Sequence, residues 1–215
     1  TMEPTEAAKI VIAHVSDGVT LARKHHLPEV IINFIATHHG TSLTRYFYNT
    51  YVNAHPNEKV DKTPFQYPGP KPSTREGAIL MMADAVEAIL DELEIPYTED
   101  DTWKKTGGNA GNIFAKLEGE GEPMLLCAHL DSVAPALGKK AVLKEDGTIT
   151  SGGDTVLGAD DLAGVAEILE TLRRLKERNI PHRPIEVLFT YAEELYDVGS
   201  EFFDFSQIGS KEAYV

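Results

Sequence analysis

The sequence has one cysteine, Cys127, and one tryptophan among its 215 residues. A single cysteine excludes an internal disulfide and is typical of a reducing compartment, which predicts a cytoplasmic location. No apolar run approaches the roughly 18 residues that a membrane-spanning helix needs, and no signal-peptide pattern opens the chain. The hydrophobic fraction of 42% and the charged fraction of 25% are those of an ordinary globular protein.

Acidic charge is concentrated in one part of the chain. Residues 1–90 carry 8 basic against 9 acidic side chains, whereas residues 91–215 carry 12 against 25. Six of the eight histidines lie before residue 60. The asymmetry indicates two units with separate histories, and the acidic part disfavours binding to a nucleic-acid polymer.

Hydrophobic periodicity also changes along the chain. A period near 3.6 predicts helices over residues 7–24, 28–40, 42–53 and 75–93, with five prolines between residues 55 and 72. Beyond Pro96, strand patterns at 112–117, 124–130 and 185–191 enclose a hairpin at 141–150 and a helix at 161–179. A further helix is expected to start within 199–205. We therefore expect an α+β composite, with an all-helical unit (1–88) packed on an α/β unit with a mostly parallel sheet (89–215).

Acidic residues and one histidine follow predicted strands and a helix start in the second unit. His129 and Asp131 end the stretch LLCAHLDSV, Asp160 and Asp161 open a helix, and Glu193 with Glu194 follows a strand. In open α/β sheets, ligands gather outside the carboxyl ends of strands, so these side chains are candidates for one metal site. Taken singly, each has an ordinary alternative: HxD is common, acidic pairs cap helices, and Glu pairs are usually solvated.

The segments TGGNAGNIFAKL, AHLDSV, LGADDLAG and FTYAEE together resemble the N-terminal part of the dinuclear-zinc peptidase T and carboxypeptidase G-like metallopeptidases, over about residues 89–215. The resemblance implies that His129, Asp160 and Glu194 bind two zinc ions, with Asp160 bridging them. It also implies that Glu193 is the general base and that Asp131 orients His129. Two further ligands of this family have no counterpart before Val215, and Leu162 stands where the family has lysine.

The first unit carries a second set of candidate metal ligands. His14 lies on the first expected helix, His38 and His39 end the second, and Asp84 lies on the fourth. Imidazole and carboxylate together suit Mn, Fe or Zn, although a single helical histidine is more often structural or solvated. The segments HVSDGVTLARKHHLP, IATHHGTSLTRYFY and FQYPGPKPSTREGAILMMADAVEA resemble the C-terminal half of the HD-domain phosphohydrolase of seven-transmembrane receptors that hydrolyse cyclic di-AMP. That resemblance covers about residues 3–88 and implies metal ligation by all four residues.

The two resemblances meet within residues 81–101, as in a fusion of two domain fragments, and they leave three functional hypotheses. The first is a two-zinc hydrolase of di- and tripeptides, and the second is an HD-type phosphodiesterase that uses Mn or Fe on cyclic dinucleotides. The third is a catalytically inert fusion, since each family has ligands that this sequence lacks. A homodimer is expected in each case, because pairing would cover the edge of a truncated sheet.

Overall fold

The computed structural model describes residues 2–56, 58–108, 110–195 and 198–215. Contacts between residues divide the chain into two compact units, Thr1–Ser73 and Thr74–Val215. Among the described residues, no helix is both long and apolar enough to cross a membrane.

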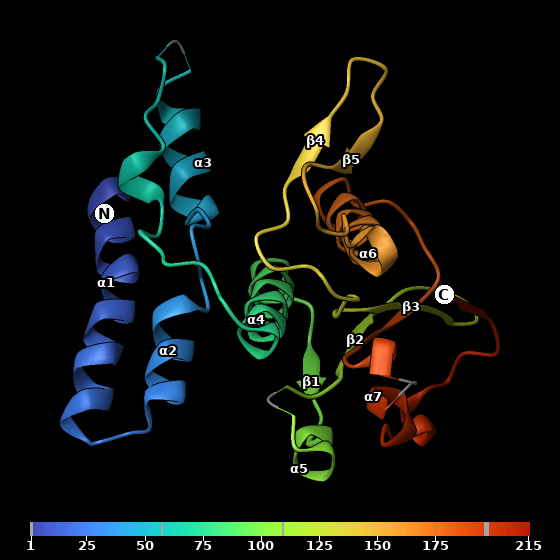
Figure 1. Cartoon of the computed structure of the whole chain (residues 1–215). Helices are drawn as coiled ribbons and strands as arrows, with labels where there is room; N and C mark the ends of the chain where they lie inside the picture. Colours follow the sequence, from blue (N-terminus) through green and yellow to red (C-terminus); the bar gives the residue numbers. More distant parts are fainter. Residues whose placement is uncertain (1, 57, 109, 196–197) are drawn as a thin grey trace. The chain divides into compact units, whose positions relative to one another are not determined.

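The first unit is helical. It contains α1 (Pro4–Lys24), α2 (Glu29–Thr37), α3 (Arg45–Ala54) and a short 3-10 turn, η1 (Thr63–Phe65) (Figure 1). Helix α1 packs against α2, α3 and η1. A Cβ on Gly18 would lie 2.9 Å from Cγ2 of Ile35, so glycine permits the close approach of α1 and α2. The proline-rich stretch is ordered, because the Thr44 amide donates to the Phe65 carbonyl and the Tyr67 amide to the Ser42 carbonyl.

The second unit is built on a five-stranded mixed sheet with the order β1-β2-β6-β3-β7. The strands are β1 (Tyr97–Glu99), β2 (Ile113–Leu117), β3 (Met124–His129), β6 (Ile185–Thr190) and β7 (Ala213–Tyr214). Strand β2 pairs antiparallel with β1 and β6, whereas β3 pairs parallel with β6 and β7. Strands β4 (Ala141–Leu143) and β5 (Ile149–Ser151) form a separate two-stranded hairpin.

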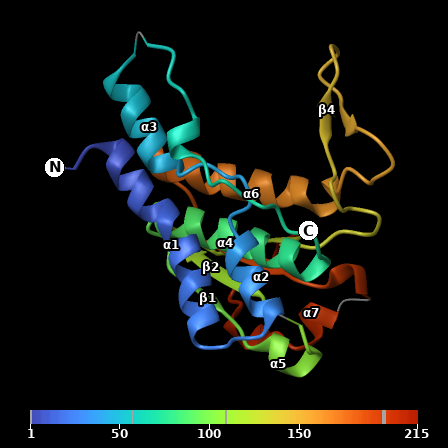
Figure 2. The ribbon, with the colours of Figure 1, turned by 60° about the vertical axis from the view of Figure 1, so that its left-hand side comes forward.

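Two helices cover one face of the sheet. Figure 2 shows α4 (Arg75–Glu92) and α6 (Ala159–Glu177) beside the sheet. Both helices share one apolar core with alternate residues of β2, β3 and β6. Val86, Leu172 and Phe189 are fully buried in this core. The opposite face carries a smaller cluster in which Phe114, Leu188 and Phe203 pack together. Because both faces are covered, every residue of β6 is buried, and Val187, Leu188 and Phe189 follow one another as apolar residues.

The fold class expected from the sequence is confirmed as α+β, with a helical N-terminal region and a mixed sheet. Thr74 caps α4, since its hydroxyl accepts a hydrogen bond from the Gly77 amide at 3.1 Å. In place of the helix expected to start within 199–205, the short α7 (Val198–Glu201) begins just before that range. The sequence patterns did not predict strands β1 and β7 or the short helix α5 (Thr102–Thr106). The sequence boundary at residue 88 lies inside α4 and stays a prediction.

Candidate metal centres

His129 ends β3 and is buried, with the two nitrogens of its ring facing different partners. Nδ1 lies 3.1 Å from the backbone oxygen of Asp131 and 3.5 Å from its Oδ1. Nε2 lies 3.1 Å from Oδ1 of Asp160 and 3.7 Å from Oε2 of Glu193. A proton held on Nδ1 by Asp131 leaves the Nε2 lone pair directed at the carboxylates, which is the arrangement of a metal-binding histidine.

Asp131 connects this strand end to the loop after β6. Its side chain is fully buried, and its two carboxylate oxygens accept hydrogen bonds from the backbone amides of Glu193 at 3.0 Å and Glu194 at 3.3 Å. Ala192, at the start of that loop, has a positive φ of 61°, which turns the following peptides toward Asp131. One buried carboxylate therefore positions both His129 and the two glutamates.

The two aspartates at the start of α6 have different roles. Asp161 caps the regular part of the helix, since its Oδ1 accepts from the Gly164 amide at 3.1 Å. Asp160 has a non-helical backbone, with φ −88° and ψ 105°, and its side chain is 89% exposed while reaching Nε2 of His129. The capping alternative raised by the sequence thus applies to Asp161 and not to Asp160.

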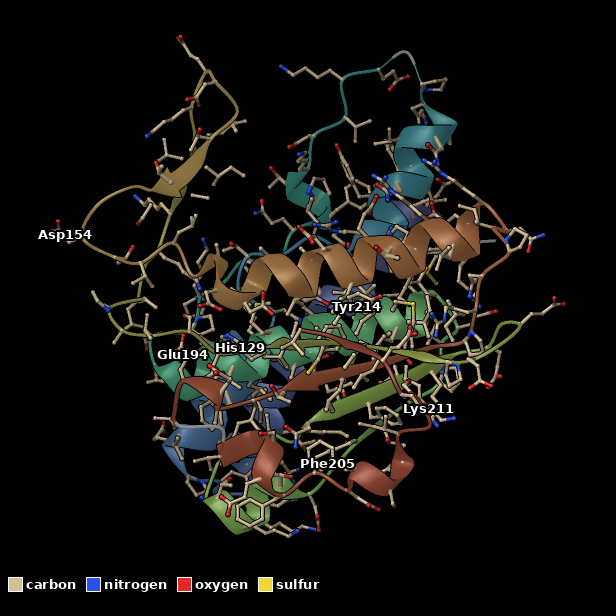
Figure 3. All side chains as sticks on the ribbon, turned by 90° about the vertical axis from the view of Figure 1, so that its right-hand side faces the viewer. His129, Asp154, Glu194, Phe205, Lys211 and Tyr214 are labelled. Atoms are coloured by element: carbon tan, nitrogen blue, oxygen red, sulfur yellow. The ribbon has the colours of Figure 1, made fainter. Side chains whose placement is uncertain are left out.

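Three side chains from separate elements meet at this edge of the sheet. Ligand atoms of His129, Asp160 and Glu194 all lie within 4.8 Å of one another, and Figure 3 shows His129 and Glu194 side by side. Burial acts to lower the pKa of His129, but the hydrogen bond to Asp160 and the charges of Asp131 and Glu193 hold that pKa above its ordinary value. One imidazole and two carboxylates form a donor set that suits zinc, so the residues present fit a divalent metal ion.

A buried polar network lies behind the loop that carries the glutamates, and sequence reasoning did not assign it a role. The Asn112 side chain is fully buried; its amide donates to Asp100 Oδ2 at 2.8 Å and to the Gly199 carbonyl at 2.9 Å. Its oxygen accepts from the Tyr191 amide at 3.3 Å. Asn112 therefore holds the chain on both sides of the loop containing Glu193 and Glu194. The only signal in the sequence is its place in the quoted segment TGGNAGNIFAKL.

The first unit contains a separate cluster of His14, His38 and His39, whose ligand nitrogens lie within 4.8 Å of one another. Nδ1 of His14 faces the Val11 carbonyl at 2.5 Å, and Nδ1 of His38 faces the Ile35 carbonyl at 2.8 Å. A carbonyl only accepts, so Nδ1 is the donor of each ring in these contacts, and Nε2 is the nitrogen of each ring that faces the cluster.

Those two Nε2 atoms lie 3.3 Å apart. Two nitrogens bound tetrahedrally to one zinc ion at its usual bond length are separated by about 3.3–3.4 Å. Facing lone pairs repel unless a cation or a proton lies between them, so this geometry also fits a divalent metal.

Two further residues bear on the histidine cluster. Tyr67, which the sequence did not single out, stacks on His39 with ring centroids 4.2 Å apart. Asp84 lies on α4 and belongs to the second compact unit. Metal ligation by Asp84 stays a prediction.

Comparison with known proteins matches two parts of the chain to different families. Residues 2–89 match the HD domain family, and residues 112–212 match peptidase family M28. A cyclic-di-AMP phosphodiesterase, PgpH of Bacillus subtilis, is 35% identical over 98 residues, covering 46% of this chain and 14% of its own length. Peptidase T of Serratia proteamaculans is 53% identical over 66 residues, covering 31% of this chain and 16% of the relative.

A solved structure agrees with the peptidase match. The crystal structure of aminopeptidase PepT from Bacillus cereus is 38% identical, with a TM-score of 0.58 over 61% of this chain and 36% of the other. The chain spans at most about a third of the length of the curated relatives it matches. Both resemblances read from the sequence are confirmed, and the chain joins an HD-domain-like segment to a segment similar to metallopeptidases of the M28 and peptidase T kind.

Proposed function

We propose that the second unit is a metal-dependent hydrolase of short peptides. The observation that carries the proposal is the position of His129 Nε2, which lies 3.1 Å from Asp160 and 3.7 Å from Glu193. Glu194 completes the cluster, and Asp131 holds the two sides of it together. The name of one relative, Peptidase T, supports a peptide as the substrate, and a similar solved structure, a tripeptidase from Staphylococcus aureus, supports a short one.

His129, Asp160 and Glu194 would hold the metal, with zinc as the ion that best suits one imidazole and two carboxylates. A bound zinc ion polarises the peptide carbonyl and lowers the pKa of water at the site. Glu193 would accept a proton from the attacking water and deliver it to the departing amine. Asp131 would keep the His129 ring turned so that Nε2 faces the site.

The test uses the purified chain with added zinc and a set of di- and tripeptides. We expect Glu193→Gln to lower the hydrolysis rate by about 10²–10⁴-fold while the bound zinc is retained. Glu167→Gln, an exposed glutamate on α6, is the matched control and should leave the rate unchanged. Absence of peptide hydrolysis, or an unchanged rate in Glu193→Gln, would exclude the proposal.

A second candidate function rests on the first unit. The 3.3 Å separation of the His14 and His38 Nε2 atoms supports a metal site there, and Mn or Fe would suit an HD-type phosphodiesterase. The named activity of PgpH supports cyclic di-AMP as the substrate. Hydrolysis of cyclic di-AMP with added Mn or Fe, lost in His38→Ala and kept in Glu193→Gln, would support this function.

The same two assays, on the unchanged chain, test the third alternative. A chain that hydrolyses neither peptides nor cyclic di-AMP with any of the three metals would be an inert fusion. The cytoplasmic location and the homodimer stay predictions; light scattering at working concentration tests the homodimer, which a monomeric mass would exclude.

A further inference from the structure

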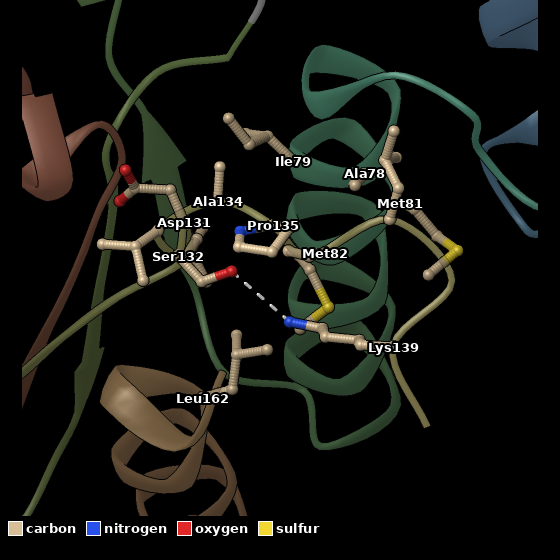
Figure 4. A pocket seen from close by; sticks show the side chains of 14 residues that line it. Ala78, Ile79, Met81, Met82, Asp131, Ser132, Ala134, Pro135, Lys139 and Leu162 are labelled. Carbon is tan, nitrogen blue, oxygen red and sulfur yellow. Dashed lines mark hydrogen bonds between the residues drawn. The ribbon is translucent and has the colours of Figure 1, made fainter. Parts of the chain in front are cut away.

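A cavity of about 440 Å³ opens within the second unit, between the first half of α4, residues 130–139 and the start of α6 (Figure 4). Its wall is mostly apolar and includes Met81, Met82, Val133, Pro135, Leu137 and Leu162. The volume lies in the range of sites for small molecules, which are typically apolar with a few polar groups that fix orientation.

One cation belongs to this apolar wall. Lys139 is half-buried, and its Nζ lies 3.5 Å from the Ser132 hydroxyl, as the dashed line in Figure 4 marks. Among the described residues, no carboxylate lies within ion-pairing distance of Lys139 Nζ, and burial lowers the pKa of this ammonium group. A partly buried charge without a counter-charge is unfavourable, so an anion supplied by a ligand would be stabilised beside it.

Asp131 cannot serve as that counter-charge. It lines the same cavity, but its side chain is fully buried and accepts from the Glu193 and Glu194 amides. The cavity therefore offers a ligand one cation, one hydroxyl and an apolar wall.

The cavity adjoins the candidate zinc site on two sides. Residues 130–139 continue directly from the end of β3, where His129 lies. On the other side, Lys139 Nζ lies against Gly158, two residues before Asp160. The contact is so close that a Cβ added at Gly158 would collide with Nζ. A substrate whose carbonyl reaches His129 and Asp160 would have its neighbouring groups next to this cavity.

We propose that the cavity binds an apolar carboxylate, with the carboxylate on Lys139 and Ser132 and the apolar group among Met82, Pro135 and Leu162. In a short peptide this ligand is the C-terminal residue, so the substrates would have a free C-terminus and an apolar last side chain. The choice of a peptide rests on the proposed peptidase function. Binding of an apolar carboxylate in the cavity does not depend on that function.

The test is calorimetric titration of the full chain in EDTA with N-acetyl-leucine and with its C-terminal amide. We expect N-acetyl-leucine to bind with a Kd on the order of 1 mM, as its size allows, and the amide to bind at least tenfold more weakly. Lys139→Met should weaken N-acetyl-leucine at least tenfold, since methionine keeps the apolar stem and removes the charge. Lys140→Met changes an exposed neighbour and should leave binding unchanged.

A second variant keeps the test independent of Lys139. Ala136→Trp would fill the cavity, and it should weaken the acid and the amide alike. Equal binding of acid and amide, unchanged binding in Lys139→Met, or no binding of N-acetyl-leucine would each overturn the proposal.

The titration in EDTA separates this inference from the proposed function. Binding that depends on Lys139, in a chain that hydrolyses no peptide, would support the cavity and exclude the peptidase. Conversely, equal hydrolysis of free and amidated tripeptides, without binding of N-acetyl-leucine, would support the peptidase and overturn the cavity.

Discussion

The side-chain amide of Asn112 donates a hydrogen bond of 2.9 Å to the backbone carbonyl of Gly199, 87 positions away in the chain. The two residues belong to different parts of the second unit, one beside the start of β2 and the other in α7. Between Tyr191, which also bonds to Asn112, and Gly199 lie both glutamates of the candidate zinc site. The geometry of that site thus depends on a residue that does not contact it.

Replacing Asn112 should weaken metal binding more than its distance from the ligands suggests. In Asn112→Asp the carboxylate would face both the Gly199 carbonyl and the carboxylate of Asp100, which repel it. We expect zinc affinity to fall by about 10–100-fold, the usual effect of losing an outer partner of a metal site. Competition with a chromophoric chelator measures this, and Asn49→Asp, at an exposed position of α3, is the control. Unchanged affinity in a folded Asn112→Asp variant would contradict the positioning role.

Asp131 should contribute to stability as well as to the site. In Asp131→Asn an amide group replaces one of the two oxygens that accept from the Glu193 and Glu194 amides, and it leaves a buried donor without a partner. We expect a loss of about 1–3 kcal/mol in the free energy of unfolding of the second unit.

Urea unfolding, followed by the fluorescence of the single tryptophan, Trp103, measures that loss because Trp103 lies in the second unit. The matched control is Asp154→Asn at an exposed position, which should change the free energy of unfolding by less than about 0.5 kcal/mol. Equal stability of Asp131→Asn and the unchanged chain would show that the loop does not depend on this carboxylate.

The sequence predicted the long elements because each carries its own pattern. Helices α1, α4 and α6 show the 3.6 period over several turns, and β6 contains three apolar residues in succession, Val187, Leu188 and Phe189. Strands β1 and β7 escaped prediction because they are three and two residues long, and their pairing with β2 and β3 defines them. Short strands have too few residues for a period to show.

The residues of the candidate sites likewise include some that the sequence indicated and some that it did not. The sequence patterns singled out His129 and two acidic pairs, and the resemblance to the metallopeptidases selected Asp160 and Glu194 from those pairs. The structure places ligand atoms of these three residues together. The role of Asn112 could not be predicted, because it depends on a contact between residues far apart in the chain. The half-buried Lys139 was equally hidden, since only the folded wall around it distinguishes it from the exposed Lys140.

The histidine cluster of the first unit should bind a metal without help from the peptidase-like site. His14→Ala removes one of two nitrogens that lie 3.3 Å apart, so we expect the metal bound to this unit to be lost. Elemental mass spectrometry on the chain carrying Asp160→Asn counts the remaining metal with and without His14→Ala. His25→Ala, an exposed histidine at the end of the same helix, is the control. Equal metal content with and without His14 would contradict a site at this cluster.

The environment of Glu186 predicts how the stability of the second unit changes in acid. It lies buried on the central strand β6, 2.9 Å from Lys116 Nζ, and accepts from the Gly209 and Ser210 amides at 3.0 Å. Burial alone would raise the pKa of Glu186, but the donors from Ser210, Lys116 and Gly209 outweigh it and lower that pKa to about 2. The ionised carboxylate therefore holds residues 209–210 against the sheet.

A pKa that is lower in the folded state stabilises the fold at pH values above the unfolded pKa, and the stabilisation is lost as pH falls through the folded pKa. We expect Glu186→Gln to lower the free energy of unfolding by on the order of 2–3 kcal/mol at pH 7. The difference from the unchanged chain should shrink between pH 4.5 and pH 2, where Glu186 itself becomes neutral. Urea unfolding at pH 7, 4 and 3, with the exposed Glu120→Gln as control, measures it. A difference that stays constant down to pH 3 would mean that the charge of Glu186 does not stabilise this face of the sheet.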